Sequence, residues 1–92
     1  MDWSQIIGFY YVAKHGSFTK AADTIFKTQS ALTHQIKSLE TELDCLLFER
    51  IGKRKIRLTE AGERLFSFAE EMIQKYNYLI DDLNELKGLT KC

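Results

Sequence analysis

The sequence of 92 residues contains no proline, only five glycines and only two cysteines. The chain therefore lacks the turn residues of a β-sandwich and the composition of a collagen-like or disordered protein. Cys45 and Cys92 lie far apart and form no Cys-x-x-Cys pair, which argues against a disulfide framework or a zinc ribbon. With 45% apolar residues, the composition indicates one small, mostly helical globular domain.

Segments that would target the chain to a membrane are also missing. No apolar run approaches the roughly 18 residues that a membrane-spanning helix needs. The first residues, Met-Asp-Trp-Ser-Gln, show no basic region leading into an apolar stretch, as a secretory signal would. We therefore expect a cytoplasmic protein without a membrane partner.

The formal net charge is zero, but the charges are unevenly distributed along the chain. Residues 1–59 carry nine basic and six acidic side chains, whereas residues 60–92 carry four basic and seven acidic ones. The front part of the chain is therefore basic and the tail is acidic, which suggests that only the front part faces a negatively charged partner.

Apolar residues at helical spacing predict three short helices in the first half of the chain. The first spans residues 3–14, with Asp2 or Ser4 as its cap and Gly16 as its end. The second follows Ser17 at once and ends before residue 28. The third runs from Thr28 or Gln29 to about residue 43. The apolar rows expected in the core are Trp3, Ile6, Ile7, Tyr10 and Ala13 on the first helix, and Leu32, Ile36, Leu39 and Leu43 on the third.

A short two-stranded hairpin and one long helix are predicted for the rest of the chain. Residues 47–50 and 55–59 flank a turn at Gly52. Thr59 is a plausible N-cap for a helix that continues to about residue 87 and ends at Gly88. Such a helix is about 42 Å long and must project from a body about 27 Å across.

The long helix carries an apolar stripe that a solvated monomer would not tolerate. We expect a second copy of the chain to cover this stripe in a homodimer. The alternative is that the stripe folds back onto its own domain. The residues assigned to the dimer interface are Leu65, Ala69, Met72, Ile73, Tyr76, Leu79, Ile80, Leu83 and Leu86.

Two helices joined by a short turn, the second with a polar outer face, form the layout of a helix-turn-helix, whose second helix lies in the major groove of DNA. The outer row of the third helix is Ser30, His34, Lys37 and Thr41, with Gln29 and Thr33 beside it. Gln can bridge adenine N6 and N7, Thr can contact thymine, and His or Lys can donate to guanine or phosphate. This row predicts double-stranded DNA as the partner, although many surface helices are equally polar.

The predicted hairpin is strongly basic. Residues 50–57 contain five cations and no acidic residue, which suits a wing that lies against phosphates or enters a minor groove. RNA, anionic lipid or an acidic protein could also accept such a hairpin. A helical protein-interaction module that docks on an acidic protein is therefore the main alternative function.

The sequence offers no catalytic constellation. It contains no glycine-rich phosphate loop and no nucleophile that can be paired with a base. Neither His15 nor His34 has a partner at metal-ligand spacing, and we expect Cys45 to be a small buried hydrophobic residue. We expect no enzymatic activity, no metal and no cofactor.

The motif that carries the most specific information spans residues 16–65. The segments GSFTKAADTIFKTQSALTHQIKSLETELDCLLFER and RLTEAGERL resemble the N-terminal domain of LysR-type bacterial transcriptional regulators, and the resemblance covers the chain from Trp3 to the end of the long helix. It implies a mainly α fold: a winged helix-turn-helix with a short β-hairpin wing and a long C-terminal linker helix. That helix would pair antiparallel with its twin, and full-length family members usually form tetramers.

The resemblance also assigns roles to individual residues. Base contacts would come from Gln29, Ser30, Thr33 and His34. Contacts with the DNA backbone and minor groove would come from Ser17, Thr28, Lys37, Arg50, Lys53 and Arg54. Ser30 stands where proline is frequent in the family and His34 where arginine is frequent. Histidine cannot make the bidentate contact of arginine, so the base read at this position is open.

The resemblance divides the chain into three parts. Residues 1–59 form the DNA-binding domain, residues 60–88 the dimerisation helix and residues 89–92 the remnant of a hinge. Family members normally continue into an effector-binding domain, and no small-molecule effector site is visible in these residues.

Overall fold

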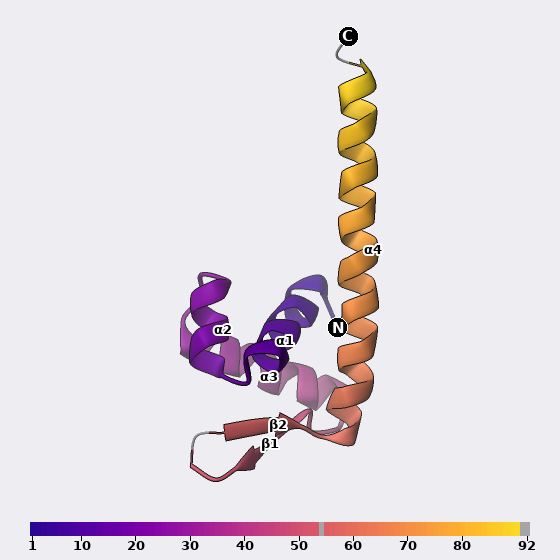
Figure 1. Cartoon of the computed structure of the whole chain (residues 1–92). Helices are drawn as coiled ribbons and strands as arrows, with labels where there is room; N and C mark the ends of the chain where they lie inside the picture. The colour runs from indigo at the N-terminus through magenta and orange to yellow at the C-terminus, as the bar shows by residue number, and fades with distance from the viewer. Residues whose placement is uncertain (54, 91–92) are drawn as a thin grey trace.

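The computed structural model describes residues 1–53 and 55–90. Over these residues the chain forms four helices and a hairpin (Figure 1). The elements are α1 (Trp3–His15), α2 (Phe18–Thr24), α3 (Gln29–Leu43), β1 (Phe48–Ile51), β2 (Lys55–Leu58) and α4 (Glu60–Thr90). The predicted mainly α, winged helix-turn-helix architecture is therefore confirmed, with helix and strand bounds within a few residues of those expected.

Each of the first three helices begins at a side chain that caps it. The Asp2 side chain accepts a hydrogen bond from the backbone N–H of Gln5, and Gln5 Oε1 accepts one from the backbone N–H of Asp2, so the pair forms a capping box. Ser17 accepts from Lys20 N and Thr28 from Ala31 N. These caps fix the starts of α1, α2 and α3, and Asp2 rather than Ser4 is the cap of α1.

The core lies between α1 and the elements packed around it. Phe9, Val12, Leu32, Ile36 and Leu39 are almost completely buried. The row predicted for α3 is thus confirmed except for Leu43, which is exposed at the end of that helix. The row predicted for α1 is wrong in part, because α1 contacts α2, α3 and α4 and therefore buries two sides.

Two rings of α1 face α4 instead of the centre of the core. The Trp3 ring lies 5.1 Å from the Tyr76 ring, and the Tyr10 ring stacks on Phe66 at 5.4 Å. Phe9 and Val12, which are not in the predicted row, are the residues of α1 that are completely buried.

The segment between α3 and β1 corrects a second expectation. Asp44 adopts a left-handed conformation with φ of 54° and ends α3. The following residues Cys45 and Leu46 are exposed, and Leu47 is the residue that enters the core. Cys45 is therefore not the buried hydrophobic residue that we expected. The turn at Asp44 directs Leu47, two residues further on, into the core instead.

The hairpin is a regular antiparallel pair that turns at Gly52, whose φ is 70°. Phe48 pairs with Leu58, and Arg50 pairs with Ile56, so these four side chains share one face of the hairpin. Phe48, Ile56 and Leu58 pack against the core. Arg50 is consequently held on the face that looks toward the helices.

Helix α4 is joined rigidly to the body at its first turn. Thr59 Oγ1 donates to the Leu46 carbonyl at 2.6 Å and accepts from Gly62 N at 3.0 Å, which makes Thr59 both tether and N-cap. Phe66 and the fully buried Ala69 then pack on the core. The first three turns of α4 therefore pack on the same core as the elements before them.

The far part of α4 extends beyond the body. The helix has 31 residues, about 46 Å at 1.5 Å per residue, and the molecule measures 57 × 24 × 19 Å (Figure 1). It continues through Gly88 to Thr90, which corrects the predicted end at Gly88. Gly88 does not adopt the left-handed conformation of a helix end, and one helical glycine costs only about 1 kcal/mol. No helix within residues 1–53 and 55–90 is long and apolar enough to cross a bilayer.

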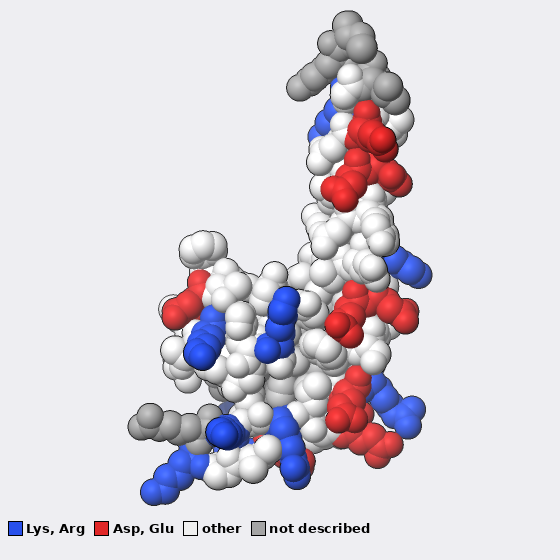
Figure 2. All heavy atoms as spheres, in the orientation of Figure 1, with Lys and Arg blue, Asp and Glu red and all other residues white. Residues whose placement is uncertain are grey.

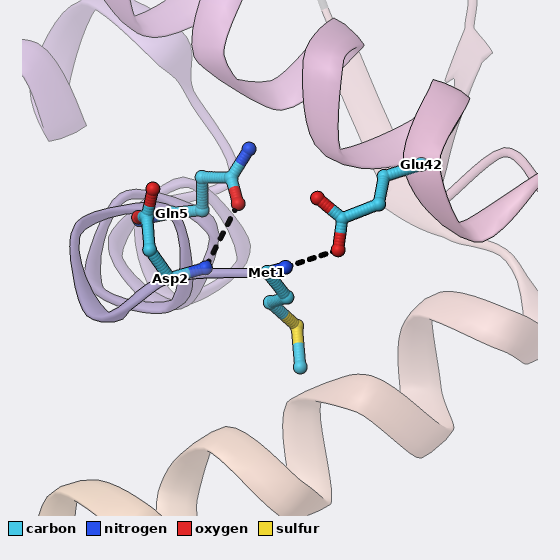
Figure 3. A network of polar contacts seen from close by, with 4 residues as sticks. All are labelled: Met1, Asp2, Gln5 and Glu42. Carbon is cyan, nitrogen blue, oxygen red and sulfur yellow. Dashed lines mark hydrogen bonds and ion pairs between the residues drawn. The ribbon is translucent and has the colours of Figure 1, made fainter.

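A polar contact joins the start of the chain to the end of α3. The amino group of Met1 forms an ion pair with the Glu42 carboxylate, next to the Asp2–Gln5 capping box (Figure 3). This contact brings the first turn of α1 beside the last turn of α3.

Two glycines of α4 provide a matched test of the tether. A Cβ atom at Gly62 would overlap the carbonyl oxygen of Leu47, whereas one at Gly88 would meet nothing within 4 Å. We expect Gly62→Ala to lower the free energy of unfolding by about 1–3 kcal/mol. Gly88→Ala should leave it unchanged or raise it by up to about 1 kcal/mol. Urea denaturation monitored by circular dichroism measures both, and equal effects would contradict the close approach at Gly62.

Candidate nucleic-acid interface

The polar side chains of α3 share one exposed face. Because Leu32, Ile36 and Leu39 are buried, the opposite side of the helix faces solvent. One open depression is lined by Gln29, Ser30, Thr33, His34 and Lys37. The structure therefore brings together five of the six residues that the sequence assigned to the outer face and N-terminal end of the third helix. The sixth, Thr41, is exposed but does not line this depression.

Two cap hydroxyls lie in grooves that share residues with this depression: Ser17 lines one with Gln29, and Thr28 lines another with His34. Thr28 and Ser17 use their oxygen atoms as acceptors for Ala31 N and Lys20 N. The O–H group of each remains able to donate, because a hydroxyl combines one donor with two acceptor lone pairs. Each can therefore cap its helix and at the same time donate to an anion such as a phosphate.

A groove beside the depression joins α2, α3 and both strands of the hairpin. Ser17, Gln29 and Arg50 line it together with Phe18 and Ile56. Arg50 reaches this groove because it lies on the core-facing side of β1. A guanidinium next to a helix N-terminus and a hydroxyl is an arrangement that suits a phosphate oxygen.

The other cations of the hairpin are not equivalent to Arg50. Arg57 forms an ion pair with Glu49 across the two strands at 2.5 Å, so its charge is partly compensated. Lys53 is exposed at the turn. Arg54, the other cation predicted for the wing tip, lies outside the described residues.

The distribution of charge follows the architecture. In the view of Figure 2, Lys and Arg side chains gather on the hairpin and helical body, and Asp and Glu side chains follow α4. The separation of charge along the sequence thus becomes a separation in space between the hairpin and helical body and the long helix α4.

The apolar stripe of α4 divides into two parts. Leu65 and Ile73 are half-buried and Ala69 is 0% exposed, whereas Leu79 is 53% and Leu83 42% exposed. Ala69 cannot belong to an interface with a second chain, because its own domain already covers it. The residues of the predicted interface that remain exposed are Met72, Tyr76, Leu79, Ile80, Leu83 and Leu86.

Comparison with known proteins identifies the chain. Residues 3–63 match the family described as bacterial regulatory helix-turn-helix protein, lysR family. The chain belongs to the LysR family. It is 37% identical over 87 residues to the RuBisCO operon transcriptional regulator of Allochromatium vinosum, which covers 95% of this chain and 28% of that protein. It is 48% identical over 73 residues to the uncharacterized HTH-type transcriptional regulator YwqM of Bacillus subtilis. This match covers 79% of the present chain and 25% of YwqM.

Solved structures of LysR-family domains share the complete fold. The BenM_DBD/catB site 1 DNA complex matches with a TM-score of 0.87 and 30% identity, covering 95% of this chain and 96% of that one. The CbnR_DBD–DNA complex matches with a TM-score of 0.81 and 29% identity, covering 95% and 99%. The chain spans about a quarter of the length of the curated regulators it matches.

For this LysR-family chain, two residues at the candidate interfaces were not predicted from the sequence. Thr19 of α2 donates from its hydroxyl to Gln29 Oε1 at 3.2 Å and so orients the Gln29 amide. Phe68 is 43% exposed, and at 100° per residue it lies on the same side of α4 as Leu79 and Leu86. The heptad pattern passes from Leu65 to Ala69 and Met72 and so leaves out Phe68, although its later positions Leu79 and Leu86 lie on the same side of the helix.

The exposed part of α4 predicts a change in oligomeric state. Leu79→Asp places a charge in the apolar stripe and should convert a dimer into a monomer. Tyr78→Asp is the matched control, because Tyr78 is exposed, lies about 100° around the helix from Leu79 and is not part of the predicted interface. Sedimentation velocity measures both. A Leu79→Asp protein of unchanged mass would show that this stripe does not hold two chains together.

Proposed function

We propose that the chain is the DNA-binding domain of a LysR-type transcriptional regulator and binds double-stranded DNA sequence-specifically. The observation that carries the proposal is the exposed face of Gln29, Ser30, Thr33, His34 and Lys37 beside Arg50. The similar BenM and CbnR domains were crystallised with DNA, which supports the same class of partner for this chain.

In the proposed complex α3 enters the major groove and reads bases with its N-terminal half. Gln29 can bridge an adenine, with its Oε1 accepting from N6 through the lone pair that Thr19 leaves free. Ser30 and Thr33 can donate to or accept from base edges. His34 offers one ring nitrogen rather than a guanidinium fork, so it makes at most a single hydrogen bond to guanine.

Contacts with phosphates fix the position of the domain on the duplex. Ser17 and Thr28 donate their hydroxyl protons, and Arg50 and Lys37 supply positive charge. Lys53 and Arg54 at the turn of the wing approach the adjacent minor groove, where the potential is most negative.

Two copies joined through the exposed stripe of α4 place two recognition helices at a fixed separation. The pairing is antiparallel, as the family resemblance implies. A full-length regulator would add an effector-binding part and assemble into a tetramer. The domain would act in the cytoplasm on bacterial promoters, and it binds no effector itself.

Selection from a random pool of duplexes at physiological salt tests the proposal. We expect one family of sequences with two related half-sites to be enriched. The affinity for them should fall about 10³- to 10⁵-fold between 50 and 200 mM salt if a dimer makes six to ten phosphate contacts. No enrichment, with capture of acidic proteins instead, would favour the protein-interaction module.

Two substitutions separate base reading from phosphate binding. Gln29→Ala should cost about 1–3 kcal/mol for the selected duplex and relax the preference at one base pair. Lys53→Ala should weaken all duplexes alike and flatten the salt dependence. Fluorescence anisotropy against the selected duplex and its single-base variants measures both effects. The reverse pattern would show that the two roles are exchanged.

A further inference from the structure

We propose that Ser4, Lys27 and Gln35 form a polar clamp that fixes the rotation of α3, and that Lys27 is a positioning residue and not a phosphate contact. The inference rests on the proposed function, because it assigns a role to residues behind the reading face. It concerns a lysine in the turn of the helix-turn-helix, where a free cation would be expected to bind the DNA backbone.

The clamp is a closed set of three hydrogen bonds between three separate segments. Lys27 Nζ donates to Ser4 Oγ at 3.0 Å and to Gln35 Oε1 at 3.0 Å. Gln35 Nε2 donates to the same Ser4 Oγ at 2.8 Å. The first turn of α1, the turn before α3 and the middle of α3 are therefore tied together at one point.

The backbone leaves room for this arrangement at Gly8 of α1. A Cβ atom there would lie 2.9 Å from Gln35 Oε1 and 3.0 Å from Leu32 Cδ1. Helices α1 and α3 approach closely because this position has no side chain. The Gln35 amide is seated over Gly8, with its oxygen directed to Lys27 and its nitrogen to Ser4.

The turn itself needs such support. Phe26 adopts a left-handed backbone conformation with φ of 57°, which is unfavourable for a residue with a side chain. Its side chain is 95% exposed and makes no contribution to packing. Backbone contacts such as Lys27 N to Ala22 O at 2.9 Å and the clamp hold the turn in place.

The clamp lies directly behind the reading face. Lys27, Thr28, His34 and Gln35 line one shared groove, so the clamp is adjacent to a residue that reads bases and to the cap of α3. A rotation of α3 by about 20° would move a side-chain tip about 6 Å from the axis by roughly 2 Å. Such a shift is enough to break a hydrogen bond to a base.

The salt dependence of binding distinguishes a positioning lysine from one that contacts phosphate. We expect Lys27→Met to bind the selected duplex about 5- to 10-fold more weakly than wild type, with an unchanged salt slope and unchanged affinity for a shuffled duplex. Lys37→Met is the matched control, because it removes an exposed cation proposed to contact phosphate. It should lower the slope by about 1 per protomer and weaken both duplexes.

A pair of substitutions at Ser4 tests the clamp without changing any charge. Ser4→Ala removes the shared acceptor and should reproduce the loss of specific affinity, whereas Ser4→Thr keeps the hydroxyl and should restore it. Thermal unfolding by circular dichroism confirms that the variants are folded.

The outcomes separate the two proposals. If wild type selects no duplex, the proposed function fails and the clamp has no reading face to position. If wild type selects a duplex but Ser4→Ala binds it normally, only the clamp is wrong. A salt slope that falls in Lys27→Met as it does in Lys37→Met would show that Lys27 contacts phosphate, and this would overturn the inference.

Discussion

The burial of one side of α3 against α1 is the constraint on which the rest of the structure depends. Leu32, Ile36 and Leu39 are almost fully removed from water, and each contributes about 1.5–3 kcal/mol by that burial. Because a helix has only one direction in which to bury such a row, the polar row with Gln29 and His34 must face outward. The same packing places the N-terminus of α3 beside the core-facing side of β1. The candidate interface is thus a consequence of the core and needs no separate explanation.

The two parts of helix α4 have different surroundings. Its first turns complete the core through Phe66 and Ala69, and its outer turns leave the core because the body is too small to accompany them. The radius of gyration of 15.7 Å exceeds the roughly 12 Å of a compact chain of this length. The apolar side chains beyond Met72 therefore need a second surface. The acidic residues of α4 follow the side away from the stripe, so the negative charge of the helix is concentrated on that side.

The sequence predicts those features that depend on local chemistry. Caps at Asp2, Ser17 and Thr28 mark helix starts because a side-chain oxygen beside free N–H groups has the same effect in any fold. The row of α3 is predictable because that helix buries one side only. The rows of α1 are not, because α1 is covered from two directions and its periodicity cannot show which side is deeper. The exposure of Cys45 and the role of Thr19 also depend on the tertiary structure. The left-handed turn at Asp44 exposes Cys45, and the approach of α2 to α3 brings Thr19 to Gln29.

Mapping of amide chemical shifts by nuclear magnetic resonance tests most directly which part of the molecule meets DNA. The chain would be labelled with ¹⁵N and titrated with the duplex selected from the random pool. The account predicts the largest shifts at Ser17, along residues 28–37 and at Arg50 and Lys53, with little change in residues 70–88. Shifts concentrated on α4, or an α3 face that remains unperturbed at saturation, would contradict it.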